Sequence, residues 1–125
     1  MVYGFEIMNS AVQYAMQNAA RNTVKNAWFF MGDMKYIFRK NLEVKDLITP
    51  DVIIVDPPRV GLHSNTIEDI EEKAPKRIIY VSCNPSTQAR DIKIFIENKY
   101  KISDIQPIDM FPHTPHIECI ITLNK

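Results

Sequence analysis

The amino-acid sequence predicts an α/β fold in which strands and helices alternate along one domain, residues 1–125. Short apolar runs typical of strands recur along the chain, and segments with helical spacing of apolar residues lie between them. The run at 52–55 is continuously apolar, as in strands that are buried in a parallel sheet. The last two strand-like segments have no helix between them, so the sheet is expected to end in an antiparallel hairpin.

The chain opens with a predicted strand over 2–7 and a helix that Asn9 or Ser10 can cap. A second short strand, 27–31, ends at Gly32-Asp33. The helix between them is expected to bury a stripe of residues with helical spacing: Val12, Ala15, Met16 and Ala19.

A strand over 52–55 is predicted next, because Pro50 and Pro57 on either side disfavour the alternative of a buried helix. The polar segment 39–46 before it is expected to be a surface connection. A helix over 65–74 should follow, with Ser64 or Asn65 as its cap and a proline just past its end.

The last part of the chain predicts a strand over 77–81 and a helix that Ser86 or Thr87 caps. Strands over 101–108 and 117–123 should then pair antiparallel. Strict alternation in the second of them places four residues on one face: Ile117, Cys119, Ile121 and Leu123.

Composition limits the function classes. With 46% hydrophobic residues the chain can build a core, and 15 basic residues balance 15 acidic ones. There is no overall basic field, so affinity for RNA would need a local patch or another domain. The two cysteines are not in a Cys-x-x-Cys arrangement, so no zinc or iron–sulfur ligand set is predicted. Free thiols and the lack of an apolar run of roughly 20 residues predict a cytoplasmic protein.

Cys83 is the clearest candidate for a nucleophile in the sequence. It follows an apolar strand-like run and directly precedes a helix start, in the sequence Ser-Cys-Asn-Pro at 82–85. The positive end of a helix favours the thiolate, which is the nucleophilic form of cysteine. The alternative is an inert buried cysteine, which is the commoner fate of a lone one.

Two further motifs accompany this cysteine in the chain. Asp-Pro-Pro-Arg-Val-Gly occupies 56–61, and Phe-Pro-His-Thr-Pro-His-Ile-Glu occupies 111–118. Together and in this order, the three motifs resemble the S-adenosylmethionine-dependent RNA (uracil-5-)-methyltransferases, which form 5-methyluridine in transfer or ribosomal RNA. The resemblance runs along the whole chain and implies a class I, Rossmann-like methyltransferase fold.

The resemblance implies a site for S-adenosyl-L-methionine. Glu6 would bind its ribose, Asp33 would lie by its adenine, and Asp56 would lie between the methyl donor and the target base. Taken alone, Glu6 and Asp33 are more readily interpreted as solvated carboxylates at strand ends. The two prolines after Asp56 stiffen its turn and so direct its carboxylate. Arg59 stands where enzymes that methylate exocyclic amino groups carry an aromatic residue, which argues against that chemistry.

The resemblance also implies covalent catalysis. Cys83 would add to carbon 6 of uracil, and Glu118 would be the general base that removes the proton from carbon 5. Glu118 alone would be taken for an ordinary exposed strand residue. Arg59 and His113 are candidate RNA contacts. His113 and His116 could also suggest a metal pair, but no third ligand is evident and the family's chemistry needs no catalytic metal.

The family's first strand and its glycine-rich loop should precede Glu6, and they are expected to be missing here. The three glycines offer no substitute loop. The chain should therefore be the C-terminal catalytic portion, inactive alone, and its unpaired sheet edges predict self-association or a shift of strands. Two alternatives remain open, namely a non-catalytic binding module and a methyltransferase that acts on another nucleic-acid atom.

Overall fold

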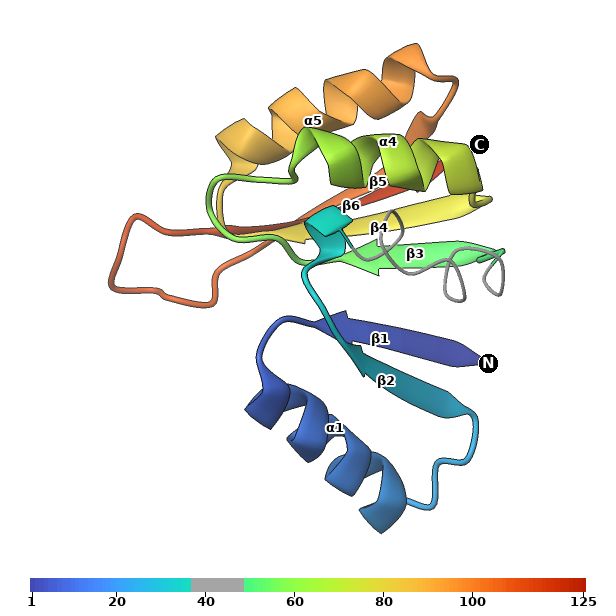
Figure 1. Ribbon diagram of the computed structural model, residues 1–125. Coiled ribbons are helices and arrows are strands. Elements are labelled where there is room, and N and C mark those ends of the chain that lie inside the picture. Colours follow the sequence, from blue (N-terminus) through green and yellow to red (C-terminus); the bar gives the residue numbers. More distant parts are fainter. Residues whose placement is uncertain (37–48) are drawn as a thin grey trace. The chain divides into compact units, whose positions relative to one another are not determined.

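The computed structural model describes residues 1–36 and 49–125, in two compact units, Met1–Leu47 and Ile48–Lys125. The predicted surface connection over 39–46 lies outside the described residues. Each unit has its own sheet: two strands in the order β1-β2, and four strands in the order β3-β4-β6-β5 (Figure 1). In the described residues strands and helices alternate from β1 to β2 and again from β3 to β5, and β6 follows β5 without a helix.

The first unit contains β1 (Val2–Glu6), α1 (Asn9–Arg21) and β2 (Ala27–Met31). The two strands pair in parallel, from Val2 opposite Ala27 to Glu6 opposite Met31. The predicted helix caps are wrong, because Met8 is the N-cap of α1, without a side-chain cap, and Asn9 is already helical.

One face of this strand pair packs on α1, and the other carries four aromatic rings. Phe29 occupies the space above Gly4, where a Cβ would lie 2.8 Å from its ring. On the predicted helix stripe, Val12 is buried, but Met16 is about half exposed. The rings on the opposite face stack in pairs, and they belong to Tyr3, Phe5, Trp28 and Phe30.

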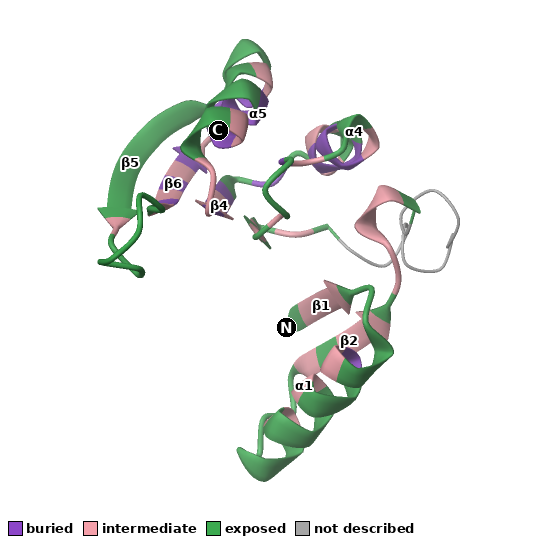
Figure 2. Cartoon of the chain, turned by 90° about the vertical axis from the view of Figure 1, so that its left-hand side faces the viewer, coloured by how far each residue is buried: buried purple, intermediate pink, exposed green. Residues whose placement is uncertain are grey.

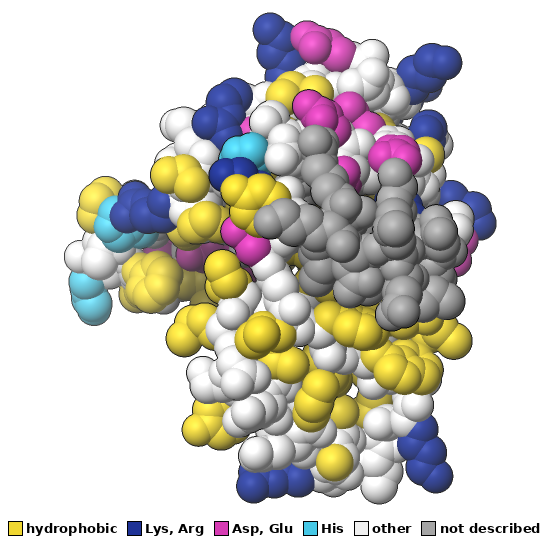
Figure 3. All heavy atoms as spheres, in the orientation of Figure 1, with side chains coloured by type: hydrophobic (Ala, Val, Ile, Leu, Met, Phe, Trp, Pro, Cys, Tyr) yellow, Lys and Arg dark blue, Asp and Glu magenta, His cyan; other side chains and the backbone are white. Residues whose placement is uncertain are grey.

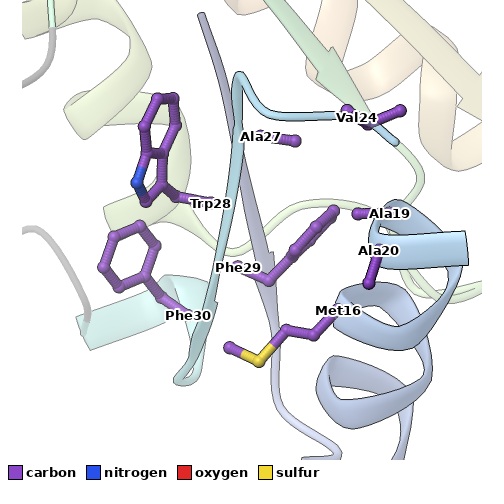
Figure 4. A pocket seen from close by; sticks show the side chains of 8 residues that line it. All are labelled: Met16, Ala19, Ala20, Val24, Ala27, Trp28, Phe29 and Phe30. Atoms are coloured by element: carbon purple, nitrogen blue, oxygen red, sulfur yellow. The ribbon is translucent and has the colours of Figure 1, made fainter. Parts of the chain in front are cut away.

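A shallow apolar hollow lies where α1 meets β2 (Figure 4). Met16, Ala19 and Ala20 from α1 approach Phe29, whereas Trp28 and Phe30 extend from the other face of β2 (Figure 4). No charged side chain lines the hollow, and it does not include Glu6 or Asp33.

The second unit contains a four-stranded sheet and two helices that cover the same face of it (Figure 1). β3 pairs with β4 in parallel, and β6 is antiparallel to both β4 and β5. The predicted antiparallel hairpin at the end of the chain is therefore confirmed. The elements are β3 (Val52–Val55), α4 (Ser64–Lys73), β4 (Arg77–Ser82), α5 (Pro85–Glu97), β5 (Lys101–Ile108) and β6 (Glu118–Asn124).

The helix caps in this unit also differ from the prediction. His63 caps α4 by accepting a hydrogen bond from the Asn65 amide, in place of Ser64 or Asn65. Asn84 caps α5, with Pro85 as the first helical residue, in place of Ser86 or Thr87. Proline at the first helical position favours this earlier start, because its fixed φ fits a helix and its missing N–H is not needed there.

The core lies between the sheet and the two helices (Figure 2). Cys119, Ile121 and Leu123 are buried on the same face of β6, as the alternation predicts, but Ile117 is exposed and precedes the strand. The expectation that 52–55 is buried on both faces is wrong for this unit, because Ile54 on the outer strand β3 is 68% exposed. Helices cover only the face that Ile53 and Val55 share.

No helix within 1–36 or 49–125 is long and apolar enough to cross a membrane.

Candidate active site

The candidate residues of the second unit meet at one edge of its sheet. Asp56 directly follows β3, Cys83 directly follows β4, and Glu118 is the first residue of β6. β3 and β4 run in parallel and β6 runs against them, so the ends of the first two strands and the start of the third coincide. In open α/β sheets, ligands bind at this carboxyl edge.

Cys83 and Glu118 adjoin the last pair of residues that join β4 to β6. Ser82 on β4 is paired with Cys119 on β6, so Cys83 follows one member of this pair and Glu118 precedes the other. Continued by one residue beyond the end of β4, an antiparallel register would place Cys83 opposite Glu118. Both residues are half-buried, which leaves each partly accessible. The two residues of the predicted covalent mechanism, 35 apart in the sequence, thus lie at the same edge of the sheet.

A short hydrogen-bonded turn holds Cys83. The Ser82 hydroxyl donates to the Asn84 carbonyl at 3.1 Å and accepts from the Asn84 amide at 3.0 Å. The Asn84 side chain accepts from the Ser86 amide and so caps α5, whose first turn holds no acidic residue. The thiol therefore lies beside the positive end of a 13-residue helix, as the sequence predicted.

The second cysteine is in a different environment. Cys119 is buried, and burial raises the pKa of its thiol, which disfavours the reactive thiolate. Of the two free cysteines, Cys83 is the accessible one.

The loop 56–62 is tied to the start of α5. The carbonyl of Arg59 accepts a hydrogen bond from Asn84 Nδ2 at 2.9 Å, and Thr87 Oγ1 lies 3.0 Å from the same oxygen. The Arg59 side chain extends to the other loop of the site, where its Nη2 is 3.4 Å from Nδ1 of His116. Asp56 is exposed at the start of this loop.

The loop between β5 and β6 is ordered by Thr114. Its amide and its hydroxyl both donate to the carbonyl of Phe111, at 2.9 and 3.0 Å, and its hydroxyl accepts from the amide of His116. Phe111 and His113 are exposed on this loop. Histidine and hydrophobic side chains gather on it in Figure 3. Exposed aromatic and basic groups suit contact with unpaired bases and phosphates.

A buried carboxylate that the sequence analysis did not single out lies behind this site. Asp91 on α5 accepts from the Tyr80 hydroxyl and from the Leu62 amide, both at 2.7 Å, and forms an ion pair with Arg90. Burial, and then the hydrogen bond to Asp91, raises the pKa of Tyr80 far above its usual value. The sequence signal for this network is an aspartate among the core-facing residues of α5, which also include Gln88, Ile92 and Phe95.

The candidate cofactor residues lie in the first unit, at the carboxyl ends of its two parallel strands. Glu6 is the last residue of β1, is exposed, and accepts from the Met8 amide at 2.9 Å. Asp33 follows β2 and accepts from the Lys35 amide at 2.9 Å. Carboxylates at this edge are suited to accept hydrogen bonds from ribose hydroxyls and from base amino groups. Both residues therefore fit the cofactor that the sequence predicts.

Among the residues that the structure describes, no three His, Cys, Asp or Glu side chains are grouped to hold a metal ion.

Comparison with known proteins gives the family. A family model described as tRNA (Uracil-5-)-methyltransferase matches residues 1–125, which is the entire chain. The chain belongs to the tRNA (uracil-5-)-methyltransferase family. An uncharacterized RNA methyltransferase of Bacteroides thetaiotaomicron is 47% identical to this family member over 122 residues. The match covers 98% of the chain and 26% of the relative, so the chain spans about a quarter of that protein's length.

Solved structures agree with this family assignment. The tRNA (uracil-54, C5)-methyltransferase of Pyrococcus abyssi, in complex with S-adenosyl-L-homocysteine, superposes with a TM-score of 0.80 at 38% identity. It covers 97% of this family member, which in turn spans 28% of that enzyme. The precorrin-6y C5,15-methyltransferase of Geobacter metallireducens has a TM-score of 0.72 at 12% identity, which shows that the α/β methyltransferase fold is shared.

Proposed function

We propose that the protein at its full natural length transfers a methyl group from S-adenosyl-L-methionine to carbon 5 of a uridine in RNA. The pairing of Ser82 with Cys119, which sets the adjoining Cys83 and Glu118 at the carboxyl edge of the sheet, supports this proposal. A nucleophile and a base at the same edge of the sheet suit a reaction in which both groups act on one pyrimidine ring. The family and the exposed loops beside the two residues support RNA as the substrate.

Cys83 starts the reaction. Its thiolate forms a bond to carbon 6 of uracil, and the electron pair of the C5–C6 double bond moves to carbon 5 as an enolate. S-adenosyl-L-methionine supplies the methyl group that carbon 5 then takes up. Cys83 directly precedes Asn84, the cap of α5, and the loop that begins at Asp56 is hydrogen-bonded to that cap.

Glu118 completes the reaction. Its carboxylate removes the proton from carbon 5, the C5–C6 double bond re-forms, and the Cys83–C6 bond breaks to release the thiolate. The net products are 5-methyluridine, S-adenosyl-L-homocysteine and one proton. Arg59 and His113 are proposed to contact the RNA from the two loops that flank these residues.

The cofactor is proposed to bind through Glu6 and Asp33, on which the ribose and the adenine would be held. Calorimetric titration of the full-length protein with S-adenosyl-L-methionine tests this. Glu6→Gln should weaken binding about tenfold, as expected for loss of a charge-assisted hydrogen bond. Glu97→Gln, at the far end of α5, is the matched control and should leave the affinity unchanged. Equal affinities for the two variants would contradict the role of Glu6.

The covalent step is tested with tRNA and rRNA transcripts that contain 5-fluorouridine. Fluorine cannot leave carbon 5 as a proton does, so the protein–RNA adduct should persist on a denaturing gel. Cys83→Ala should form none, and Cys119→Ala should form as much as the wild type. Methyl transfer by Cys83→Ala would refute the mechanism and favour a methyltransferase that acts on another atom.

The chain by itself is proposed to be a non-catalytic portion, because it spans about a quarter of the length of its relative from Bacteroides. Assay of the 125-residue chain beside the full-length protein tests this. Turnover by the chain alone would contradict it.

A further inference from the structure

Asp91 is the centre of a buried network of hydrogen bonds that holds the backbone of the loop 56–62. The residue is 0% exposed. One carboxylate oxygen, Oδ2, accepts from the Leu62 amide and from the Tyr80 hydroxyl, and the other, Oδ1, is paired with Arg90 at 2.7 Å. A buried carboxylate is costly unless such donors surround it. Two elements thus hold the carboxylate, α5 and β4, and the loop is attached to it.

Further side chains from the same face of α5 hold the next peptide groups of the loop. Asn84 and Thr87 bind the carbonyl of Arg59, and Arg90 donates to the carbonyl of Val60 at 2.9 Å. Spacings of three and four residues place these side chains on one face of the helix. We call this set the α5 stripe, and its members are Asn84, Thr87, Arg90 and Asp91.

The loop fits the α5 stripe closely. Gly61 has a φ of +83°, and a Cβ at this position would lie 2.6 Å from both Arg90 Nη2 and Asp91 Oδ2. The loop therefore contacts the stripe through bare backbone, with a glycine where a side chain would collide. No strand ladder holds residues 56–62, so these side-chain bonds determine where the loop lies.

We infer that the α5 stripe is a positioning device for the active site, with Asp91 as its principal positioning residue. The inference rests on the proposed function. Holding the Arg59 carbonyl fixes the base of the side chain that reaches His116, and it ties the loop that begins at Asp56 to Asn84, the residue after Cys83. Asp91 touches no reacting atom. It acts by keeping the loop in one arrangement, so that the substrate meets a preorganised site.

The first test measures amide hydrogen exchange and needs no activity. Asp91→Asn has one acceptor oxygen in place of two, so it cannot serve both the loop and Arg90. Exchange of the Leu62 amide should become about tenfold faster, whereas β4 should keep its protection. Asp69→Asn is the matched control, because Asp69 is a buried carboxylate on α4 at 5% exposure. Unchanged exchange at Leu62, or equal acceleration in β4, would overturn the inference.

The second test measures steady-state kinetics of RNA methylation by the full-length protein, with rates normalised to the folded fraction. Asp91→Asn should lower kcat about tenfold and leave KM for RNA within about twofold, because the ground-state contacts remain. Asp69→Asn should keep the wild-type kcat. Equal kcat for the two variants would overturn the inference.

A milder variant covers the case in which Asp91→Asn does not fold. Thr87→Val keeps the shape of the side chain and removes only the hydroxyl that contacts the Arg59 carbonyl. Thr87→Val should lower kcat by a smaller factor than Asp91→Asn does. An unchanged kcat would count against the positioning role of the α5 stripe. If the wild-type protein methylates no RNA, the proposed function fails, and the exchange experiment still decides whether Asp91 holds the loop.

Discussion

Cys83 and Cys119 differ in their access to solvent. Cys119 is 7% exposed, and burial raises the pKa of its thiol. Cys83 lies at the start of a helix and is only half-buried. Brief treatment of the folded chain with iodoacetamide should therefore label Cys83 alone, because Cys119 is buried and its raised pKa disfavours the reactive thiolate. Peptide mass spectrometry reads the result, and faster labelling of Cys119 would contradict this account of the two thiols.

Glu118 is predicted to act after methyl transfer and not before it. In Glu118→Gln the methyl group is transferred but the carbon 5 proton stays, so the Cys83–RNA bond cannot break. A covalent complex with ordinary uridine RNA should accumulate, visible on a denaturing gel. Cys83→Ala should form no such complex. An inactive Glu118→Gln variant without adduct would place Glu118 before the covalent step.

Tyr80 should make stability depend on alkaline pH. Its pKa is raised in the folded state, so the unfolded chain loses this proton first, near the ordinary tyrosine pKa of about 10. The stabilisation is complete below that pH and is lost as pH rises above it. Tyr100, whose pKa burial also raises, acts in the same direction.

Denaturant unfolding between about pH 9 and 11 checks this. Tyr80→Phe should show a smaller loss of unfolding free energy over that range than the wild type. Tyr14→Phe, which alters an exposed tyrosine on α1, should keep the wild-type slope. A Tyr80→Phe slope equal to that of the wild type would contradict the prediction.

At the level of elements, α5 contributes to the site in two ways. Its cap, Asn84, belongs to the turn that contains Cys83, and its inner face holds the loop after β3. Gly61 is where these elements come closest. Gly61→Ala should lower the free energy of unfolding by more than about 1 kcal/mol, because it adds a collision to an unfavourable φ. Val60→Ala, at an exposed neighbour, should change it by less than about 0.5 kcal/mol. Chemical denaturation measures both, and similar values would contradict the close fit.

The described part of the molecule contains two sheets, with edge strands β1 and β2 in one and β3 and β5 in the other. Exposed apolar side chains accompany one of them, since Ile54 on β3 is 68% exposed. Unpaired edges with apolar faces favour association with another chain. The isolated 125-residue chain is predicted to self-associate, with a molar mass by light scattering above its monomer mass of 14.5 kDa.

A lysine at the β3 edge should reduce this association. Ile54→Lys should lower the molar mass toward that of a monomer, because a charge on an edge strand opposes pairing. Ile96→Lys, at an exposed position on α5, is the matched control and should not change it. A monodisperse wild-type monomer with cooperative unfolding would contradict the prediction.

Local sequence patterns predicted most of the helices and strands. They failed for the helix caps, where several adjacent side chains could cap the same helix. The strands over 27–31, 52–55 and 101–108 are confirmed at both ends. The helix caps were wrong, because several adjacent residues can cap and only the packed chain selects one: His63 for α4 and Asn84 for α5. The Asp91 network was not foreseen, since an aspartate in a helix says nothing about its partners.

By itself, the sequence determined the α/β class, the terminal hairpin and the family, because apolar periodicity and ordered motifs are local properties of the chain. The tertiary structure alone decided that Cys83 and Glu118 adjoin one pair of residues, Ser82 and Cys119, and that α5 holds the loop 56–62. Strand register and long-range hydrogen bonds depend on which elements pack together. That choice follows from burial over the whole unit, which no short segment encodes.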